Sequence, residues 1–248
     1  MIIAVSGKGG MGKSTLSALV VRHLVKHVSR PVLAVDADPN SNLGDKLGLS
    51  AERTIGNLRE DAFKHKHEVP AGTPKQRSME CEVQQAIVEG AGVDLLTMGR
   101  GEGPGCYCFV NNLLRTFLQS LSSGYKHVVI DNEAGMEHLS RRTNDKVDLM
   151  LVVSDRTPTG LKAARRIAEM AAELGVVRGR MGLVVNRVAE DEVLASETIA
   201  ETGLHLLGSV PEDPLIRDYE LRSAPLLDLP DESSAASAVS IILKNSGL

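Results

Sequence analysis

Residues 1–15 read MIIAVSGKGGMGKST, and this stretch decides the fold. An apolar run over residues 1–5 leads into a glycine-rich turn, and apolar residues recur from Leu16 onward, which predicts a strand, a loop and a helix. A glycine, four further residues and then Gly-Lys-Ser is the phosphate-binding loop pattern. The glycines let backbone N–H groups close around phosphate oxygens, and the helix N-terminus adds partial positive charge. We expect a nucleotide to be bound by Gly9, Gly10, Met11, Gly12, Lys13, Ser14 and Thr15, with Lys13 on the β- and γ-phosphates and Ser14 on Mg²⁺.

Apolar runs of strand length alternate with stretches of helical periodicity along the whole chain. This alternation predicts a single α/β domain over residues 1–248, a P-loop NTPase fold with a mostly parallel central sheet and helices on both faces. The middle of residues 50–92 is expected to be a loop. The expected strands are Ile2–Ser6, Val32–Asp36, Val93–Met98, His127–Asp131, Leu149–Ser154, Met181–Asn186 and Leu206–Val210, and the expected helices are Lys13–Val28, Val110–Leu121, Thr159–Leu174, Glu190–Glu201 and Ser233–Leu243.

The composition excludes several classes of protein. The chain has 248 residues and a formal net charge of −4, so it has no bulk attraction to nucleic acid or to an anionic membrane. No apolar run approaches the length of a membrane span, and the first residues carry no basic prefix. We therefore expect a cytoplasmic protein without a membrane or nucleic-acid partner. Three cysteines, an odd number, argue against a disulfide framework.

Acidic residues stand where two of the expected strands end. The carboxyl ends of parallel strands line the ligand crevice, and alternate residues of a strand face the same way. Asp36 and Asp38 are therefore expected to face the phosphates and the metal, with Asp38 orienting or deprotonating the attacking water; an acidic turn before proline is the alternative. Asp131 is expected to hold Mg²⁺, and Gly135 to offer its N–H group to the γ-phosphate.

Two further strand ends carry residues suited to a nucleobase. Asn186 has the paired donor and acceptor groups that read a purine edge, and Arg187 follows it directly. Pro211 and Glu212, after the last expected strand, are positioned to close over the base. We expect all four to belong to the nucleotide site.

Lys8 distinguishes this loop from an ordinary phosphate-binding loop, which needs no lysine after its first glycine. The string KGGMGKST resembles the deviant Walker A motif of the MinD/ParA and nitrogenase iron-protein group. The resemblance implies an ATPase that forms a homodimer when ATP bridges two subunits. It makes Lys8 the lysine that reaches the partner's phosphates, and makes Lys8, Lys13 and Asp38 the catalytic residues.

Cys106 and Cys108 lie two positions apart and can give one metal ion two sulfur ligands. A tetrahedral soft-ligand site wants four, and the third cysteine, Cys81, is distant in sequence. A two-fold axis supplies the same pair twice. Two small buried apolar side chains are the alternative reading of this pair. His65 and His67 alternate with lysines, which favours a solvated charged face over metal ligation.

The segments GPGCYC and DNEAGMEH narrow the resemblance to the CooC-type accessory ATPases, which insert nickel into carbon monoxide dehydrogenase, with close relatives that serve acetyl-CoA synthase. This resemblance implies that Cys106 and Cys108 bind Ni²⁺ or Zn²⁺ between two subunits and that ATP controls delivery to the client enzyme. Two alternatives stay open. One is a MinD/ParA-like positioning ATPase on a membrane or DNA, although residues 233–244 carry a single lysine. The other is an iron–sulfur electron donor, since four thiolates also suit a cluster.

Overall fold

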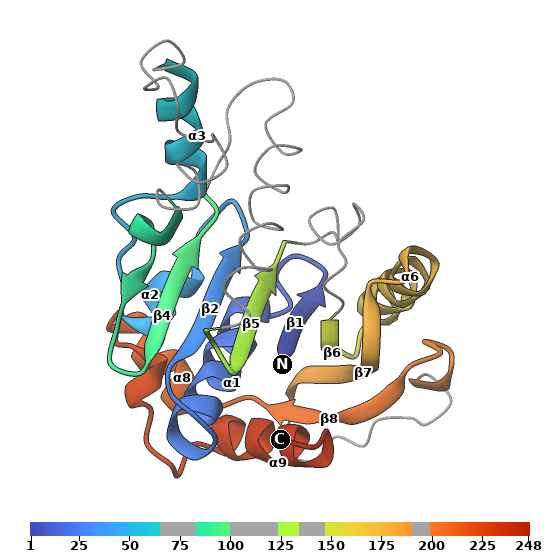
Figure 1. Ribbon diagram of the computed structural model, residues 1–248. Coiled ribbons are helices and arrows are strands. Elements are labelled where there is room, and N and C mark those ends of the chain that lie inside the picture. Colours follow the sequence, from blue (N-terminus) through green and yellow to red (C-terminus); the bar gives the residue numbers. More distant parts are fainter. Residues whose placement is uncertain (65–82, 100–123, 134–146, 190–198) are drawn as a thin grey trace.

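The computed structural model describes residues 1–64, 83–99, 124–133, 147–189 and 199–248. In this part of the chain, eight strands form one sheet in the order β3-β4-β2-β5-β1-β6-β7-β8 (Figure 1). Every neighbouring pair is parallel except β3 with β4. The strands are β1 Ile2–Gly7, β2 Val32–Ala37, β3 Val88–Glu89, β4 Val93–Thr97, β5 His127–Asn132, β6 Val147–Ser154, β7 Val177–Val188 and β8 His205–Pro211.

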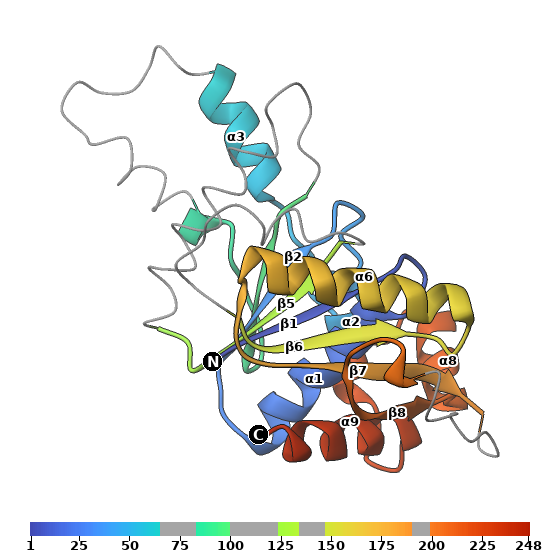
Figure 2. The same ribbon diagram turned by 90° about the vertical axis from the view of Figure 1, so that its right-hand side faces the viewer.

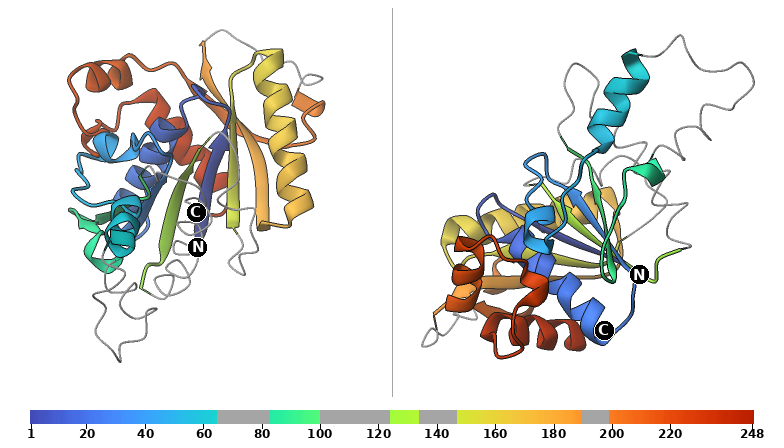
Figure 3. Two further views of the ribbon diagram at one scale, coloured as in Figure 1. Left: turned by 90° about the horizontal axis from the view of Figure 1, so that it is seen from above. Right: turned by 90° about the vertical axis from the view of Figure 1, so that its left-hand side faces the viewer.

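Helices cover both faces of this sheet, with α1 and α9 on one face and α6 on the other (Figures 2 and 3). Each face has its own apolar core, because the central strands are buried on both sides and alternate residues point to opposite faces. The helices of the described residues are α1 Lys13–His27, α2 Leu43–Leu47, α3 Ile55–Lys64, α6 Pro158–Leu174, α8 Pro214–Leu221 and α9 Ser234–Asn245, with a 3₁₀ turn η1 at Leu226–Asp228.

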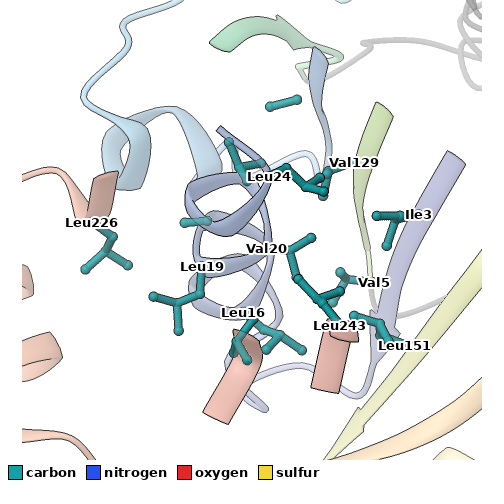
Figure 4. Close-up of a cluster of buried hydrophobic side chains, with 14 of the residues drawn as sticks. Ile3, Val5, Leu16, Leu19, Val20, Leu24, Val129, Leu151, Leu226 and Leu243 are labelled. Atoms are coloured by element: carbon teal, nitrogen blue, oxygen red, sulfur yellow. The ribbon is translucent and has the colours of Figure 1, made fainter. Parts of the chain in front are cut away.

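Helix α1 lies in the middle of its core and is buried along most of its length. Leu16, Val20 and Leu24 recur at helical spacing and belong to the same apolar cluster as Ile3 and Val5 of β1 (Figure 4). The strand before the phosphate-binding loop and the helix after it are thus both anchored in the core. Burying such side chains stabilises the fold by about 1.5–3 kcal/mol each, so the loop between them is held at two fixed ends.

All seven strands expected from the sequence are present, with ends that differ by up to four residues. The largest difference is β7, which begins at Val177 and not at Met181. The sequence reading missed the antiparallel edge strand β3 and the helices α2, α3 and α8. Helix α3 occupies part of residues 50–92, and the middle of that segment lies outside the described residues. The helix expected at Val110–Leu121 lies outside them as well.

Candidate nucleotide site

The phosphate-binding loop connects β1 to α1, and two of its glycines have left-handed backbone conformations. The φ angles are 81° at Gly10 and 83° at Gly12. Residues other than glycine rarely adopt this backbone region. A Cβ atom on Gly12 would also lie 2.4 Å from Nδ2 of Asn186. Gly12 is the N-cap residue of α1, and no side chain caps this end. The first N–H groups of α1 therefore remain available to an anion.

The two lysines of the loop differ in exposure. Lys13 is buried, with 7% of its surface exposed, and its charge acts on the carboxyl group of Asp131. Lys8 is exposed at the outer turn of the loop, where its carbonyl oxygen accepts a hydrogen bond from the N–H group of Met11. The buried Lys13 and the exposed Lys8 thus have different surroundings, and their separate roles stay predictions.

Asp131 lies near the carboxyl end of β5, beside the start of α1. Its Oδ1 atom accepts a hydrogen bond from the Ser17 hydroxyl at 3.1 Å, and the Ser14 hydroxyl also hydrogen-bonds to this carboxyl group. Its Oδ2 atom is buried and has no hydrogen-bond partner among the described residues. Burial raises the pKa of Asp131 to about 6, although the two hydroxyls and Lys13 oppose this shift. A free carboxylate oxygen beside a serine hydroxyl is a donor set that fits Mg²⁺.

Asp36 and Asp38 have different surroundings, which corrects the expectation that both face the phosphates. Both oxygens of Asp36 accept main-chain hydrogen bonds, Oδ1 from Asp38 at 3.2 Å and Oδ2 from Leu43 at 2.8 Å. Burial raises the pKa of Asp36 to about 7, with a contribution from the nearby charge of Asp131. Asp36 therefore shapes the loop after β2, because its carboxyl group is committed to the backbone.

Asp38 is the acidic residue of the loop after β2 that stays near Asp131. Its Oδ1 atom accepts hydrogen bonds from the N–H group of Asn40 at 2.9 Å and from the Asn40 side-chain amide at 3.0 Å. It is mostly buried, and its charge acts to raise the pKa of Asp131. Asp38, which follows β2, and Asp131 of the adjacent strand β5 thus lie close enough for their charges to interact.

The four residues that the sequence predicts at the nucleobase all line a single cleft. It has a volume of about 690 Å³, which is in the range of ligand pockets, and it begins at the phosphate-binding loop. Arg187 adopts a φ of 58° at an irregularity in the pairing of β7 with β8, and it faces this cleft beside Asn186. The lining includes Gly12, Thr15, Asn186, Arg187, Pro211, Glu212, Arg217 and Glu220.

Two features of the site were not predicted from the sequence. The Sδ atom of Met11 accepts a hydrogen bond from the N–H group of Asp155, the residue after β6. Helix α8 brings Arg217 and Glu220 to the cleft. The signal for α8 was present, since Asp213 followed by proline is a typical helix start, and Asp213 does cap α8 through the N–H group of Leu215.

Several predicted residues lie outside the described part of the chain. They are Cys106, Cys108 and Gly135, together with Cys81, His65 and His67. Among the residues that the structure does describe, no three His, Cys, Asp or Glu side chains gather into a metal site. No helix of the described residues is both long enough and apolar enough to cross a bilayer.

The fold and the site place the chain in a known class. Residues 2–226 match the family described as the CobQ/CobB/MinD/ParA nucleotide binding domain, and the chain belongs to this family. The structure is similar to the cell division ATPase MinD of Pyrococcus furiosus, with a TM-score of 0.72 and 25% sequence identity over 98% of this chain and 97% of that one.

Two relatives are similar along most of their length. An uncharacterised ATP-binding protein of Methanocaldococcus jannaschii is 44% identical over 96% of this chain and 95% of the relative. The carbon monoxide dehydrogenase accessory protein CooC of Rhodospirillum rubrum is 32% identical over 92% of this chain and 90% of the relative. The chain is thus a nucleotide-binding P-loop protein of the ATPase class.

Proposed function

We propose that the protein is a Mg²⁺-dependent ATPase that works as a metallochaperone for nickel or zinc. The observation that carries the ATPase part is the continuous site from the phosphate-binding loop to the cleft at β7 and β8. The cleft begins at Gly12 and Thr15, which flank Lys13 in the same loop, and extends along Asn186, which contacts that loop, to Pro211.

The chain's own residues divide the work of hydrolysis. Ser14 and Asp131 would hold Mg²⁺, which supplies charge neutralisation on the β- and γ-phosphates when bound. Lys13 binds the same phosphates from the buried side of the loop. Asp38 orients the attacking water and accepts its proton, because a main-chain N–H group bonds to its carboxyl group only through Oδ1, whereas main-chain N–H groups bond to both oxygens of Asp36.

The dimer is the second part of the proposal. Lys8 is exposed beside the phosphate loop, where a neighbouring subunit's nucleotide can meet it. ATP bound between two subunits would bring the Lys8 side chains and the Cys106 and Cys108 pairs to a common two-fold axis. Four thiolates at this axis form a tetrahedral site for Ni²⁺ or Zn²⁺. Metal and ATP are then thermodynamically coupled through the closed dimer.

The identity of the client is suggested by the relative CooC, an accessory protein of carbon monoxide dehydrogenase. We therefore assign carbon monoxide dehydrogenase, or the related acetyl-CoA synthase, as the client. A protein with this role would be cytoplasmic and would need neither nucleic acid nor membrane as a partner.

The test is metal stoichiometry by equilibrium dialysis against Ni²⁺ and Zn²⁺, with the ATPase rate measured in the same samples. We expect wild type to bind one ion per two chains and the Cys106→Ser/Cys108→Ser variant to bind none, with ATP hydrolysis retained. Cys81→Ser is the matched control and should bind metal as wild type does. Unchanged binding by the double variant would refute the metallochaperone role. A brown protein after anaerobic purification would indicate the iron–sulfur alternative.

A positioning ATPase is a second candidate, favoured by the structural similarity to MinD. Co-sedimentation of the ATP-bound protein with anionic liposomes or with DNA separates the two. We expect no sedimentation with either, whereas ATP-dependent pelleting would support the second candidate.

A further inference from the structure

Glu220 of α8 lies where three elements of the nucleotide site meet. Its Oε1 atom accepts a hydrogen bond from the hydroxyl of Thr15 at 3.0 Å and one from Nζ of Lys46 at 2.6 Å. Thr15 belongs to the first turn of α1, and Lys46 belongs to α2. One carboxylate oxygen thereby joins the helix after the phosphate loop to the helix after the Asp38 loop.

The two hydrogen-bond partners of Glu220, Thr15 and Lys46, lie beside different parts of the nucleotide site. Thr15 follows Ser14 directly. Lys46 lies in α2, whose first N–H group, that of Leu43, is held by Asp36, and Asp36 also holds the N–H group of Asp38. Glu220 itself lines the cleft beside Thr15. A chain of hydrogen bonds and one short helix therefore runs from the cleft wall to the loop that carries Asp38.

Helix α8 is built so that it can respond to the contents of the cleft. None of its eight residues is fully buried, and Leu215, Ile216 and Tyr219 pack only partly against the core. An element with few buried apolar contacts shifts at low free-energy cost. The Glu220 side chain is 43% exposed and that of Lys46 is 21% exposed, so their ion pair adds little to folding stability. Removing this pair should leave the fold intact.

The electrostatics agree with a charged carboxylate at this position. Burial acts to raise the pKa of Glu220, but the hydrogen bond and charge of Lys46 and the hydrogen bond from Thr15 outweigh it, so the pKa lies below its usual value. Glu220 is therefore ionised at neutral pH and holds both partners.

We propose that Glu220 is a positioning residue that couples occupation of the nucleoside cleft to the placement of the Asp38 loop through Lys46 and α2. This inference rests on the proposed ATPase function. A ligand that fills the cleft holds α8 in one position. The contact of Glu220 with Lys46 then holds α2 in position as well. A ligand that binds only the phosphate loop leaves α8 unfixed. Glu220 acts through Lys46, so its removal changes turnover more than it changes affinity.

The first test compares turnover of ATP with that of inorganic tripolyphosphate, which lacks base and ribose. Glu220→Gln keeps the size of the side chain and an acceptor for Thr15 but removes the charge that holds Lys46, and Lys46→Met keeps the length of the lysine stem and removes the same ion pair. We expect each change to lower kcat for ATP about tenfold with KM within about twofold, and to leave tripolyphosphate turnover unchanged. The double variant should lose no more than either single variant, because both break one link.

The matched control is Asp218→Asn, which removes a carboxylate from the same helix. Asp218 pairs with Arg222 on the exposed side of α8 and does not line the cleft, so this variant should behave as wild type. Additive losses for Glu220→Gln and Lys46→Met would contradict the coupling. A raised KM for ATP that disappears with 3′-deoxy-ATP would also contradict it, since Glu220 would then contact the ribose directly.

The second test does not require hydrolysis. Hydrogen exchange at the amides of Leu43–Leu47 should slow about tenfold when ADP is added to wild type, and this protection should be absent in Glu220→Gln while the phosphate-loop amides remain protected. Equal protection of α2 in both proteins would overturn the inference. Protection of α2 by ADP in a wild type without ATPase activity would refute the proposed reaction and retain the coupling.

Discussion

The side-chain amide of Asn186 donates a hydrogen bond to the main-chain carbonyl of Met11 at 2.9 Å. Asn186 lies near the carboxyl end of β7, 175 residues along the chain from the phosphate-binding loop that it contacts. The same amide nitrogen would be 2.4 Å from a Cβ atom on Gly12. The strand that carries the expected base-reading residue therefore also supports the loop that binds phosphate.

Replacing Asn186 should weaken nucleotide binding by more than the loss of a base contact. Asn186→Ala removes the hydrogen bond to the Met11 carbonyl, and we expect the Kd for ADP to rise about tenfold, in keeping with one hydrogen bond of ~1–1.5 kcal/mol. Isothermal titration measures this directly. Tripolyphosphate should lose affinity as well, because the loop itself is affected; a loss confined to ADP would show that Asn186 acts only on the base.

Substitution of Gly12 should impair the nucleotide site more than substitution of Asn186 does. Gly12→Ala places a side chain in the left-handed region and against the Asn186 amide. The conformational strain alone is roughly 1–2 kcal/mol. We expect ATPase activity to fall below detection and thermal stability to decrease slightly. Gly203→Ala is the matched control, because Gly203 also has a left-handed φ, 69°, but a Cβ atom there meets nothing within 4 Å and the residue does not line the cleft. Equal activity of the two variants would contradict the role given to the Gly12 geometry.

Asp36 should make the stability of the ligand-free protein depend on pH. Its pKa is raised from 3.8 to about 7 in the folded state, so between these values the folded protein holds a proton that the unfolded chain releases. The contribution of Asp36 to the free energy of unfolding therefore falls as pH rises from about 4 to 7 and is constant above that, by at most on the order of 4 kcal/mol.

Urea unfolding from pH 4.5 to 8 isolates this effect when wild type is compared with Asp36→Asn. As pH rises, the free energy of unfolding of wild type should fall relative to that of Asp36→Asn, since asparagine carries no charge to bury. The variant also loses one acceptor for a main-chain N–H group, which lowers its stability by a similar amount at every pH. Parallel pH profiles for the two proteins would show that Asp36 does not titrate in this range.

Asp213 should contribute to stability through two helix starts at once. Its Oδ1 atom caps α8, and its Oδ2 atom accepts hydrogen bonds from the hydroxyl of Ser233 at 2.6 Å and the N–H group of Ala235 at 3.0 Å, at the start of α9. We expect Asp213→Ala to lower the free energy of unfolding by ~2 kcal/mol. Asp218→Ala, on the exposed side of α8, should change it by less than about 0.5 kcal/mol. Similar losses for both variants would contradict the linking role.

The sequence predicted the parts of the site that depend on local pattern. The loop and the strand ends at Asp131 and Asn186 were found because spacing and hydrophobic runs place them without knowledge of the rest of the fold. The role of Asp36 was wrong, because the direction of its carboxyl group is set by a loop that returns to place Leu43 within reach. The Glu220 network had no sequence signal, since it joins residues 205 and 174 positions apart.

Lys8 should matter for association more than for nucleotide binding. Lys8→Ala removes an exposed side chain at the outer turn of the phosphate loop, so we expect the Kd for ADP to stay within about twofold. ATP-dependent dimerisation, followed by sizing chromatography, should be lost. Lys13→Ala is the contrasting variant and should lose both properties. An equal amount of dimer in Lys8→Ala and wild type would exclude a role for Lys8 across the interface.

The most direct measurement is the molar mass and the metal content of one chromatographic peak, obtained by light scattering and elemental analysis with Ni²⁺, Mg²⁺ and ATP present. A single chain has a mass of 26.5 kDa. We predict a particle of twice that mass with one nickel ion per two chains, which returns to the single-chain mass when ATP and metal are removed. A particle that keeps the single-chain mass under every combination of nucleotide and metal would contradict the shared nucleotide and thiolate site.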